Sequence, residues 1–354
     1  MSSLVGRFDR FQRRRRSVGI PLAVVYKYFD DQGPFMSAAL TYYAFVAIFP
    51  LLLLLSSFLG WLLAGNETLQ TRLLLGTLGQ FPIVGDQLAQ PEKLQGSAWS
   101  ITIGLLVALY GVTGLGQAAQ NVLNTAWAVP RNSRLNPVVS RFRSILVMVF
   151  GGFVVVMLTV AASFLTNLST FGVDAEGWLQ GLSTVMSLVV TAAVFSLMMR
   201  YTTSRRPSFW TALPGGITIA VGWHLLQRLG GVYVSRVMDR ATELNAIFAL
   251  VLGLIAFIYL ACIIAVIGVE VSVVLRRRLY PRALLTPFTD DVELTEADRR
   301  AYDSYAKSMR HKGFQHVEVT FDDRVSYEPE FDTSAIPKVD PGHQPSPPSG
   351  STSR

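Results

Sequence analysis

Residues 246–275 read AIFALVLGLIAFIYLACIIAVIGVEVSVVL, an apolar run in which Glu270 is the single charged side chain. A helix rises ~1.5 Å per residue, so ~20 apolar residues suffice to cross the ~30 Å hydrocarbon layer of a membrane. Three arginines, Arg276 to Arg278, follow at once. The run therefore predicts a membrane-spanning helix that ends at a charged boundary.

Five further apolar segments precede this run, at residues 36–64, 98–122, 144–168, 182–199 and 211–234. They lack the period-two alternation of a transmembrane β-barrel, and in lipid the remaining way to pair every backbone polar group is a helix. Charged residues make up 16% of the chain, against about 25% in soluble domains. The predicted fold class is all-α, a polytopic membrane bundle of six transmembrane helices.

The distribution of Lys and Arg predicts the orientation of this bundle. Basic residues gather before the first segment, in every second connection, and after the sixth segment, and the positive-inside rule places such regions in the cytoplasm. We therefore predict that both termini are cytoplasmic. The net charge of +7 is then a matter of topology, and it predicts anionic membrane lipids, not nucleic acid, as the partner of the basic face. The basic residues are Arg7, Arg10, Arg13, Arg14, Arg15, Arg16 and Lys27; Arg131, Arg134, Arg141 and Arg143; Arg200, Arg205 and Arg206; and Arg276, Arg277, Arg278 and Arg282.

Four regions follow from composition. Residues 1–34 form a basic arm, read either as an interfacial amphipathic helix on anionic lipid or as a flexible anchor that only sets orientation. Residues 35–280 form the transmembrane domain. Residues 281–333 form a cytoplasmic segment, in which Thr295 can cap a short helix over Glu296 to Met309. Residues 334–354, rich in Pro, Gly and Ser, predict a disordered tail.

Several short motifs resemble the YihY/virulence factor BrkB family over roughly residues 30–280. They are the run AALTYY at 38–43 followed by FPLL at 49–52, NVLNTAW at 121–127, LPG at 213–215 and GVE at 268–270. The resemblance implies a six-helix protein of the bacterial inner membrane. Some members of the family are associated with movement of lipid or lipopolysaccharide precursors, others with serum resistance, and the family has carried a ribonuclease label. The motif residues are Tyr42, Tyr43, Phe49, Trp127, Pro214, Gly215 and Gly268.

The residues of this chain do not favour a ribonuclease. A metal-dependent nuclease needs clustered His, Asp or Glu side chains to hold divalent ions. The four histidines are one in a span, His224, and three near the C-terminus, His311, His316 and His343, without metal-ligand spacing. The single cysteine, Cys262, lies in an apolar run and excludes an intrachain disulfide. We expect no catalytic residue, no metal site and no cofactor.

Ionisable side chains inside the spans are the main candidates for function, because they are costly in lipid. Glu270 is either a buried, partnered carboxylate or an interfacial one. His224 and Arg228 are four residues apart, with Gln227 adjoining, so they share a helix face. That face either lines a pathway for an anionic group, or His224 bonds a neighbouring helix while Arg228 extends toward the interface.

A second polar stripe, Gln117, Asn121 and Asn124, occupies one face of the second segment. It either joins helices by hydrogen bonds or lines the same pathway. Pro50 predicts a kink in the first helix. Small residues on several helix faces leave room for a homo-oligomer.

Two main hypotheses follow. The leading one is a transport protein that moves a lipid-like or amphipathic anionic substrate, with the polar residues above lining its path. The alternative is a non-catalytic membrane scaffold that recruits partners through its cytoplasmic ends. A membrane enzyme ranks third.

Overall fold

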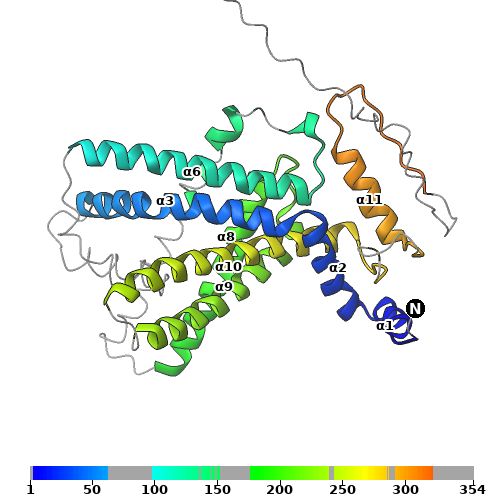
Figure 1. Ribbon diagram of the computed structural model, residues 1–354, viewed down its shortest axis with the longest axis horizontal. Coiled ribbons are helices and arrows are strands. Elements are labelled where there is room, and N and C mark those ends of the chain that lie inside the picture. The colour runs from blue at the N-terminus through cyan, green and yellow to red at the C-terminus, as the bar shows by residue number, and fades with distance from the viewer. Residues whose placement is uncertain are drawn as a thin grey trace, which may run out of the picture.

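The structure is a computed structural model that describes residues 3–62, 98–134, 136, 138–143, 145–147, 150–151, 176–238, 243–284, 286 and 292–321. These residues form helices and connections without any strand, which confirms the predicted all-α class (Figure 1). The helices are α1 (Ser3–Arg14), α2 (Arg16–Asp30), α3 (Gly33–Leu62), α6 (Ala98–Ala126), the 3₁₀ helix η2 (Arg131–Ser133), α8 (Glu176–Thr202), α9 (Phe209–Met238), α10 (Glu243–Arg277) and α11 (Glu296–Ser308).

Three helices within the described residues are long and apolar enough to cross a membrane: Thr184–Thr202 in α8, Phe209–Gly230 in α9 and Val251–Arg277 in α10. The first two predicted spans correspond to α3 and α6, which are 30 and 29 residues long. Most of the third predicted span, 144–168, lies outside the described residues, as does the predicted tail, 334–354. The count of six therefore stays a prediction.

The long helices pack as two groups, α3 with α6 and α9 with both α8 and α10. The groups meet mainly where α10 contacts α3. Glycines allow the close approach of α3 and α6: a Cβ on Gly111 would lie 2.8 Å from the backbone of Ala47, and one on Gly114 would run into the ring of Tyr43. Since a glycine has no side chain to separate the helices, two of the glycines in the second span serve packing.

The crossing of α9 and α10 explains two motif segments. Pro214 lies in the second turn of α9 and cannot donate a backbone hydrogen bond. The hydroxyl of Ser272 on α10 accepts from the N–H of Gly215 at 3.0 Å and contacts the carbonyl oxygen of Ala212 at 3.2 Å as a donor. Gly215 and Gly268 face each other there so closely that neither has room for a Cβ. The segments around 214 and 268 thus form one contact.

Gly215→Ala is expected to lower the thermal unfolding midpoint clearly, because the new Cβ would lie closer than 3.0 Å to the carbonyl oxygen of Gly268. Overpacking of this kind costs about 1–3 kcal/mol. The measurement is the unfolding midpoint of the detergent-solubilised chain, followed by size-exclusion chromatography after heating. Gly181→Ala in α8 is the matched control, since its Cβ meets no atom within 4 Å. Equal midpoints for the two variants would contradict the account of this crossing.

The connections rich in arginine meet at one end of the bundle, which we call the basic end. There the backbone N–H of Asn132 donates to the carbonyl of Arg310 at 3.2 Å, and Arg143 donates to the carbonyl of Thr203 at 3.4 Å. Helices α2 and α11 lie beside the same end (Figure 1). The basic regions therefore share one end, as the charge pattern predicts. The side of the membrane that this end faces stays a prediction.

The basic arm is not a separate element. It forms α1 and α2, and α2 packs on α10 with the side chains of Ala23, Val24 and Lys27 buried. The buried face of α2 is thus covered by α10, whereas Phe8 and Phe11 of α1 are exposed, so the choice between an interfacial helix and an anchor that only sets orientation stays open. Helix α3 continues through Pro50, and the kink predicted there stays a prediction.

Candidate functional site

Glu270, in the apolar part of α10, has a completely buried side chain. Lys27 of α2 reaches it, with Nζ 3.4 Å from Oε2 of Glu270 and 2.6 Å from Oδ2 of Asp31. Lys27 and Asp31 are buried as well. One ammonium group therefore lies between two carboxyl groups away from solvent, and we call these three residues the Lys27 site. Of the two readings of Glu270, the structure confirms the buried, partnered one.

Local sequence places the site. Ala23, Val24 and Lys27 share the buried face of α2, and the first two pack in a core cluster with Val273 of α10. Asp31 directly follows α2, four residues after Lys27, which is the spacing of neighbouring side chains on a helix. The apolar residues of α2 thus carry Lys27 to Glu270, while the end of the helix supplies the second carboxyl group.

The electrostatics of the site follow from its burial. Burial lowers the pKa of Lys27, but the nearby carboxyl groups of Glu270 and Asp31 outweigh it and hold that pKa above the ordinary value. Lys27 is therefore charged at neutral pH. Burial raises the pKa of Asp31, although Lys27 acts in the opposite direction. Asp31 therefore takes up a proton more readily than an exposed aspartate would.

A second buried cluster, the Arg282 site, attaches α11 to the bundle. The fully buried guanidinium of Arg282 donates through Nε to Oδ1 of Asp298 and through Nη2 to Oδ2 of Asp30, 3.1 Å away. The other oxygen of Asp298 accepts from the backbone N–H of Ala283 at 3.0 Å and from the hydroxyl of Thr295 at 2.7 Å. Thr295 and Asp298 form a capping box, so the predicted cap of this helix is confirmed. Helix α11 is thereby fixed to α2.

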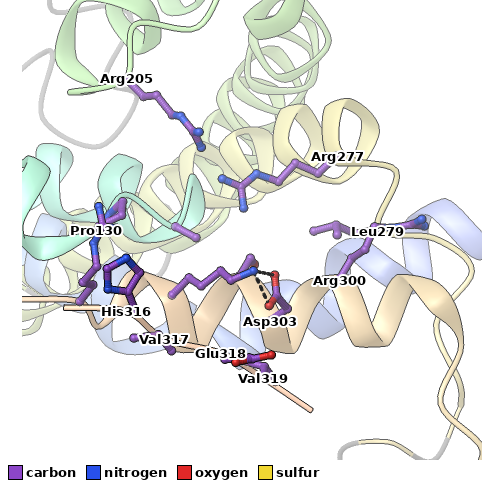
Figure 2. A pocket seen from close by; sticks show the side chains of 14 residues that line it. Pro130, Arg205, Arg277, Leu279, Arg300, Asp303, His316, Val317, Glu318 and Val319 are labelled. Atoms are coloured by element: carbon purple, nitrogen blue, oxygen red, sulfur yellow. Dashed lines mark hydrogen bonds and ion pairs between the residues drawn. The ribbon is translucent and has the colours of Figure 1, made fainter. Parts of the chain in front are cut away.

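A cavity of about 790 Å³ lies between α11 and the ends of the spans. Figure 2 shows side chains entering it from α10, from α11 and from the α8–α9 connection. Most of the charged groups in its wall are basic. The lining residues are Ala128, Pro130, Arg205, Arg277, Leu279, Arg300, Asp303, Ser304, Lys307, Arg310, His316, Val317, Glu318 and Val319.

The amide stripe of α6 does not line this cavity. Asn124 is buried, and its Oδ1 accepts from the backbone N–H of Ser204 at 3.2 Å. Asn121 is exposed and accepts from Arg134 at 3.2 Å, while Gln117 is exposed. The two asparagines thus tie connections to α6, which supports the structural reading of the stripe over the pathway reading.

The polar group of α9 is separate from Glu270. Gly222 lies against Ile264 of α10, so His224 lies near a position six residues, or about 9 Å, from Glu270 along that helix. Within the described residues Nε2 of His224 is buried without a hydrogen-bond partner. Arg228 is exposed, and the adjoining Gln227 is partly buried. The structure therefore does not bring the candidate residues of α9 and α10 into one site.

Sequence reasoning missed five residues of the two buried clusters: Lys27, Asp30, Asp31, Arg282 and Asp298. Lys27 and Arg282 were counted only as topology charges. A signal was present for the first, since Lys27 and Asp31 form an oppositely charged pair at the end of an apolar stretch. The pairing of Arg282 with Asp298 depends on a loop and has no such local pattern.

The remaining motif residues have packing roles where the structure describes them. Trp127 is buried in the core cluster at the basic end, and its carbonyl accepts a hydrogen bond from Arg277. Tyr43 packs between α3 and α6, 5.2 Å from the exposed ring of Tyr42. The side chain of Phe49 lies outside the described residues.

No group of three or more His, Cys, Asp or Glu side chains able to hold a metal ion occurs within the described residues. The absence of nuclease activity stays a prediction, because activity itself is not tested by this geometry.

Comparison with known proteins addresses the resemblance noted from the motifs. The chain is 24% identical over 264 residues to a protein of Bacillus subtilis (strain 168) named putative ribonuclease-like protein YfkH, covering 71% of this chain and 93% of that protein. No solved structure matches the chain. The sequence model described as virulence factor BrkB matches residues 24–290, which include the Lys27 site, Arg282 and every motif segment. The apolar helices and this match identify the chain as a membrane protein of the virulence factor BrkB family.

Proposed function

We propose that this protein is a multi-pass transporter of the bacterial plasma membrane that moves a lipid-like or amphipathic anionic substrate. In this proposal its basic end and both termini are in the cytoplasm. The observation that carries the proposal is the Lys27 site, a buried group of three ionisable side chains at the end of an apolar span. Such groups are expensive in a membrane, and their usual roles there are substrate paths and proton relays.

The chemistry of the Lys27 site fits a coupled transport step. Two carboxyl groups compete for one ammonium group, so a proton or an approaching ligand changes which of them is paired. The site lies where α2 and α10 meet, and α2 leads directly into α3 of the other helix group. A change in its charge therefore acts on the contact between the two groups of helices.

Exposed aromatic side chains support the position of the basic end at a membrane surface. Phe35 lies in the first turn of α3 and Trp210 in the first turn of α9, and each residue is 77% exposed. Aromatic residues of this kind are enriched at the boundary between lipid and water. On α1, Phe8 and Phe11 are exposed beside several arginines, which suits contact with anionic lipids. The positive-inside rule then makes this boundary the cytoplasmic one.

A scaffold remains the second candidate, and one observation favours it. Phe314 follows α11 and is 84% exposed, on a segment whose helix is held firmly by the Arg282 site. Its ring is therefore available for contact with a partner protein.

The test of transport uses the purified full chain in liposomes. Movement of a fluorescent anionic phospholipid between leaflets is measured by adding a membrane-impermeant quencher. We expect the wild-type chain to accelerate movement and Glu270→Gln to slow it by about tenfold or more, equivalent to ~1.4 kcal/mol in the barrier.

Glu296→Gln is the matched control, since Glu296 is an exposed glutamate on α11 whose ion pair with Arg300 spans 3.5 Å. It is expected to retain wild-type rates. Thermal unfolding of each variant before reconstitution separates loss of transport from loss of fold. Absence of lipid movement with folded wild-type protein would sink the proposal for lipid. If Glu270→Gln instead moves lipid at the wild-type rate, the Lys27 site is not part of the path.

A further inference from the structure

The cavity at the basic end has a strong surplus of positive charge. Five arginine or lysine side chains line it against Asp303 and Glu318, with His316 in addition. Three cationic groups thus have no acidic counterpart in the wall. The five cationic residues are Arg205, Arg277, Arg300, Lys307 and Arg310.

The acidic side chains of the region do not neutralise the cavity. Asp303 is engaged by Lys307, whose Nζ is 2.8 Å away, and Arg300 is paired with Glu296 outside the lining. Arg205 and Arg277 form no ion pair with any carboxylate of the described residues. Both extend toward the same space, opposite Asp303 of α11 (Figure 2). Two guanidinium groups thus face the cavity without an ion pair to a described carboxylate, although Asp31 is near enough to act on the charge of Arg277.

Contacts outside the cavity fix α11 and Arg277, which form parts of its wall. Arg300, Asp303, Ser304 and Lys307 have the spacing of one helix face and line the cavity, while Asp298 on another face of α11 belongs to the Arg282 site. Arg277 uses one of its five N–H donors on the carbonyl of Trp127, which fixes the guanidinium and leaves other donors available. Arg277 and the cationic groups of α11 are therefore preorganised, which reduces the entropy lost when a ligand binds.

The backbone near the cavity adopts left-handed conformations at several non-glycine residues. Of the described non-glycine residues with positive φ, Ala128 lines the cavity, while Arg206 and Arg278 directly follow the two arginines without ion pairs. Left-handed backbone costs a non-glycine residue roughly 1 kcal/mol or more, and it concentrates at sites that must position a group.

We propose that this cavity is a binding site for a phosphate-bearing anion, with Arg205 and Arg277 as its main ligands. A guanidinium group donates two parallel hydrogen bonds to phosphate oxygens. Arg205 and Arg277, which form no ion pair with a described carboxylate, can each donate such bonds to one phosphate from different sides. The volume of about 790 Å³ is that of a small-molecule site and exceeds the need of phosphate alone. The phosphate therefore carries a further group, and it is either a lipid headgroup or a soluble phosphate ester.

The position of the cavity in the fold allows both a lipid headgroup and a soluble phosphate ester to reach it. Arg277 is the last residue of α10, so one wall lies at the boundary of the span, where headgroups gather. The opposite wall, formed by α11 and residues 316–319, lies beyond the ends of the long helices (Figure 1). Binding is a property of the cavity, so the inference stands or falls independently of transport.

The test measures binding to the purified full chain with two probes. In detergent, glycerol 3-phosphate is titrated by isothermal calorimetry; in nanodiscs, the unfolding midpoint is compared between phosphatidylcholine alone and phosphatidylcholine with phosphatidic acid. We expect saturable binding that weakens with added salt, since charge attraction is screened. Arg205→Gln is expected to weaken it by about tenfold or more, because a hydrogen-bonded charge is lost.

Arg206→Gln is the matched control, because it removes the same charge from the next residue, which is exposed and does not line the cavity. Binding of glycerol 3-phosphate that Arg205→Gln alone weakens supports the site with a soluble ester as its ligand. An effect of phosphatidic acid that Arg205→Gln alone removes supports it with a lipid headgroup. Absence of saturable binding of either probe would overturn the proposal, as would equal losses in the two variants, which indicate general surface charge.

Discussion

Lys27→Met is expected to destabilise the folded protein by about 3–5 kcal/mol, the usual cost of removing one partner from a buried ion pair. Methionine fills much of the same space, but Asp31 and Glu270 then remain buried with no ammonium group between them. Their mutual repulsion and lost solvation both oppose folding. The measurement is the thermal unfolding midpoint of the full chain in detergent, together with the yield of monodisperse protein.

Two comparisons make this expectation specific. Lys307 and Asp303 form a lysine–aspartate pair with the same four-residue spacing on α11, but the pair is partly exposed. Lys307→Met is therefore expected to cost less than about 1 kcal/mol. Adding Asp31→Asn and Glu270→Gln to Lys27→Met removes the unpaired carboxylates, so this triple variant is expected to recover most of the loss. If Lys27→Met and Lys307→Met have equal midpoints, burial of the Lys27 site is not what stabilises it.

Arg282→Met is expected to release α11 from the bundle while the long helices stay folded. The guanidinium of Arg282 is fully buried between Asp298 and Asp30, so its removal leaves two carboxylates without their partner at this contact. Hydrogen exchange at the α11 amides, followed by mass spectrometry, should accelerate by about 100-fold or more, since the helix opens locally. Cleavage within α11 by a protease should accelerate with it.

Arg300→Met provides the comparison on the same helix. Its ion pair with Glu296 is exposed, so exchange at α11 should change by no more than a few-fold. Unchanged exchange at α11 in Arg282→Met would show that other contacts, such as that of Ala301 in the core cluster, hold the helix by themselves. The same variant also tests the cavity, because α11 forms one of its walls.

Much of the helical architecture follows from continuous apolarity. The run 246–275 predicts α10, which the structure extends to Glu243–Arg277, and the run 182–199 lies within α8, Glu176–Thr202. The extra residues include charged ends, such as Glu176, Glu243 and Arg277, which an apolar run does not contain. Hydrophobicity therefore located these helices, while their full lengths depend on capping and on contacts at the membrane boundary.

The candidate site was predictable only in part. Glu270 stood out because a carboxyl group is expensive in an apolar helix. Its partner Lys27 lies far away in sequence, and only the packing of α2 on α10 brings the two together. His224 and Arg228 carried the same kind of signal, yet their register on α9 places them away from Glu270. Helix periodicity defines a face, but not the neighbour that covers it.

One wall of the cavity has a recognisable sequence pattern, but the pattern is ambiguous. Arg300, Asp303, Ser304 and Lys307 form a polar stripe on α11, which reads equally well as a solvated helix face. Its meaning depends on Arg205 and Arg277, which come from two other connections. Arg205 and Arg277, which the sequence analysis assigned only to membrane orientation, thus lie beside the polar face of α11 in the folded protein.

The glycine contact between α9 and α10 also limits how the bundle can change shape. With Gly215 and Gly268 in direct backbone contact, and the Ser272 hydroxyl bonded to two groups of α9, sliding of one helix past the other would break these bonds and force side chains into the gap. We therefore expect α9 and α10 to move together as one rigid body. In the proposed transport, a passage would open by separation of α9 and α10 from α3 and α6, and the ion pair of Lys27 with Glu270 would hold α2 against α10.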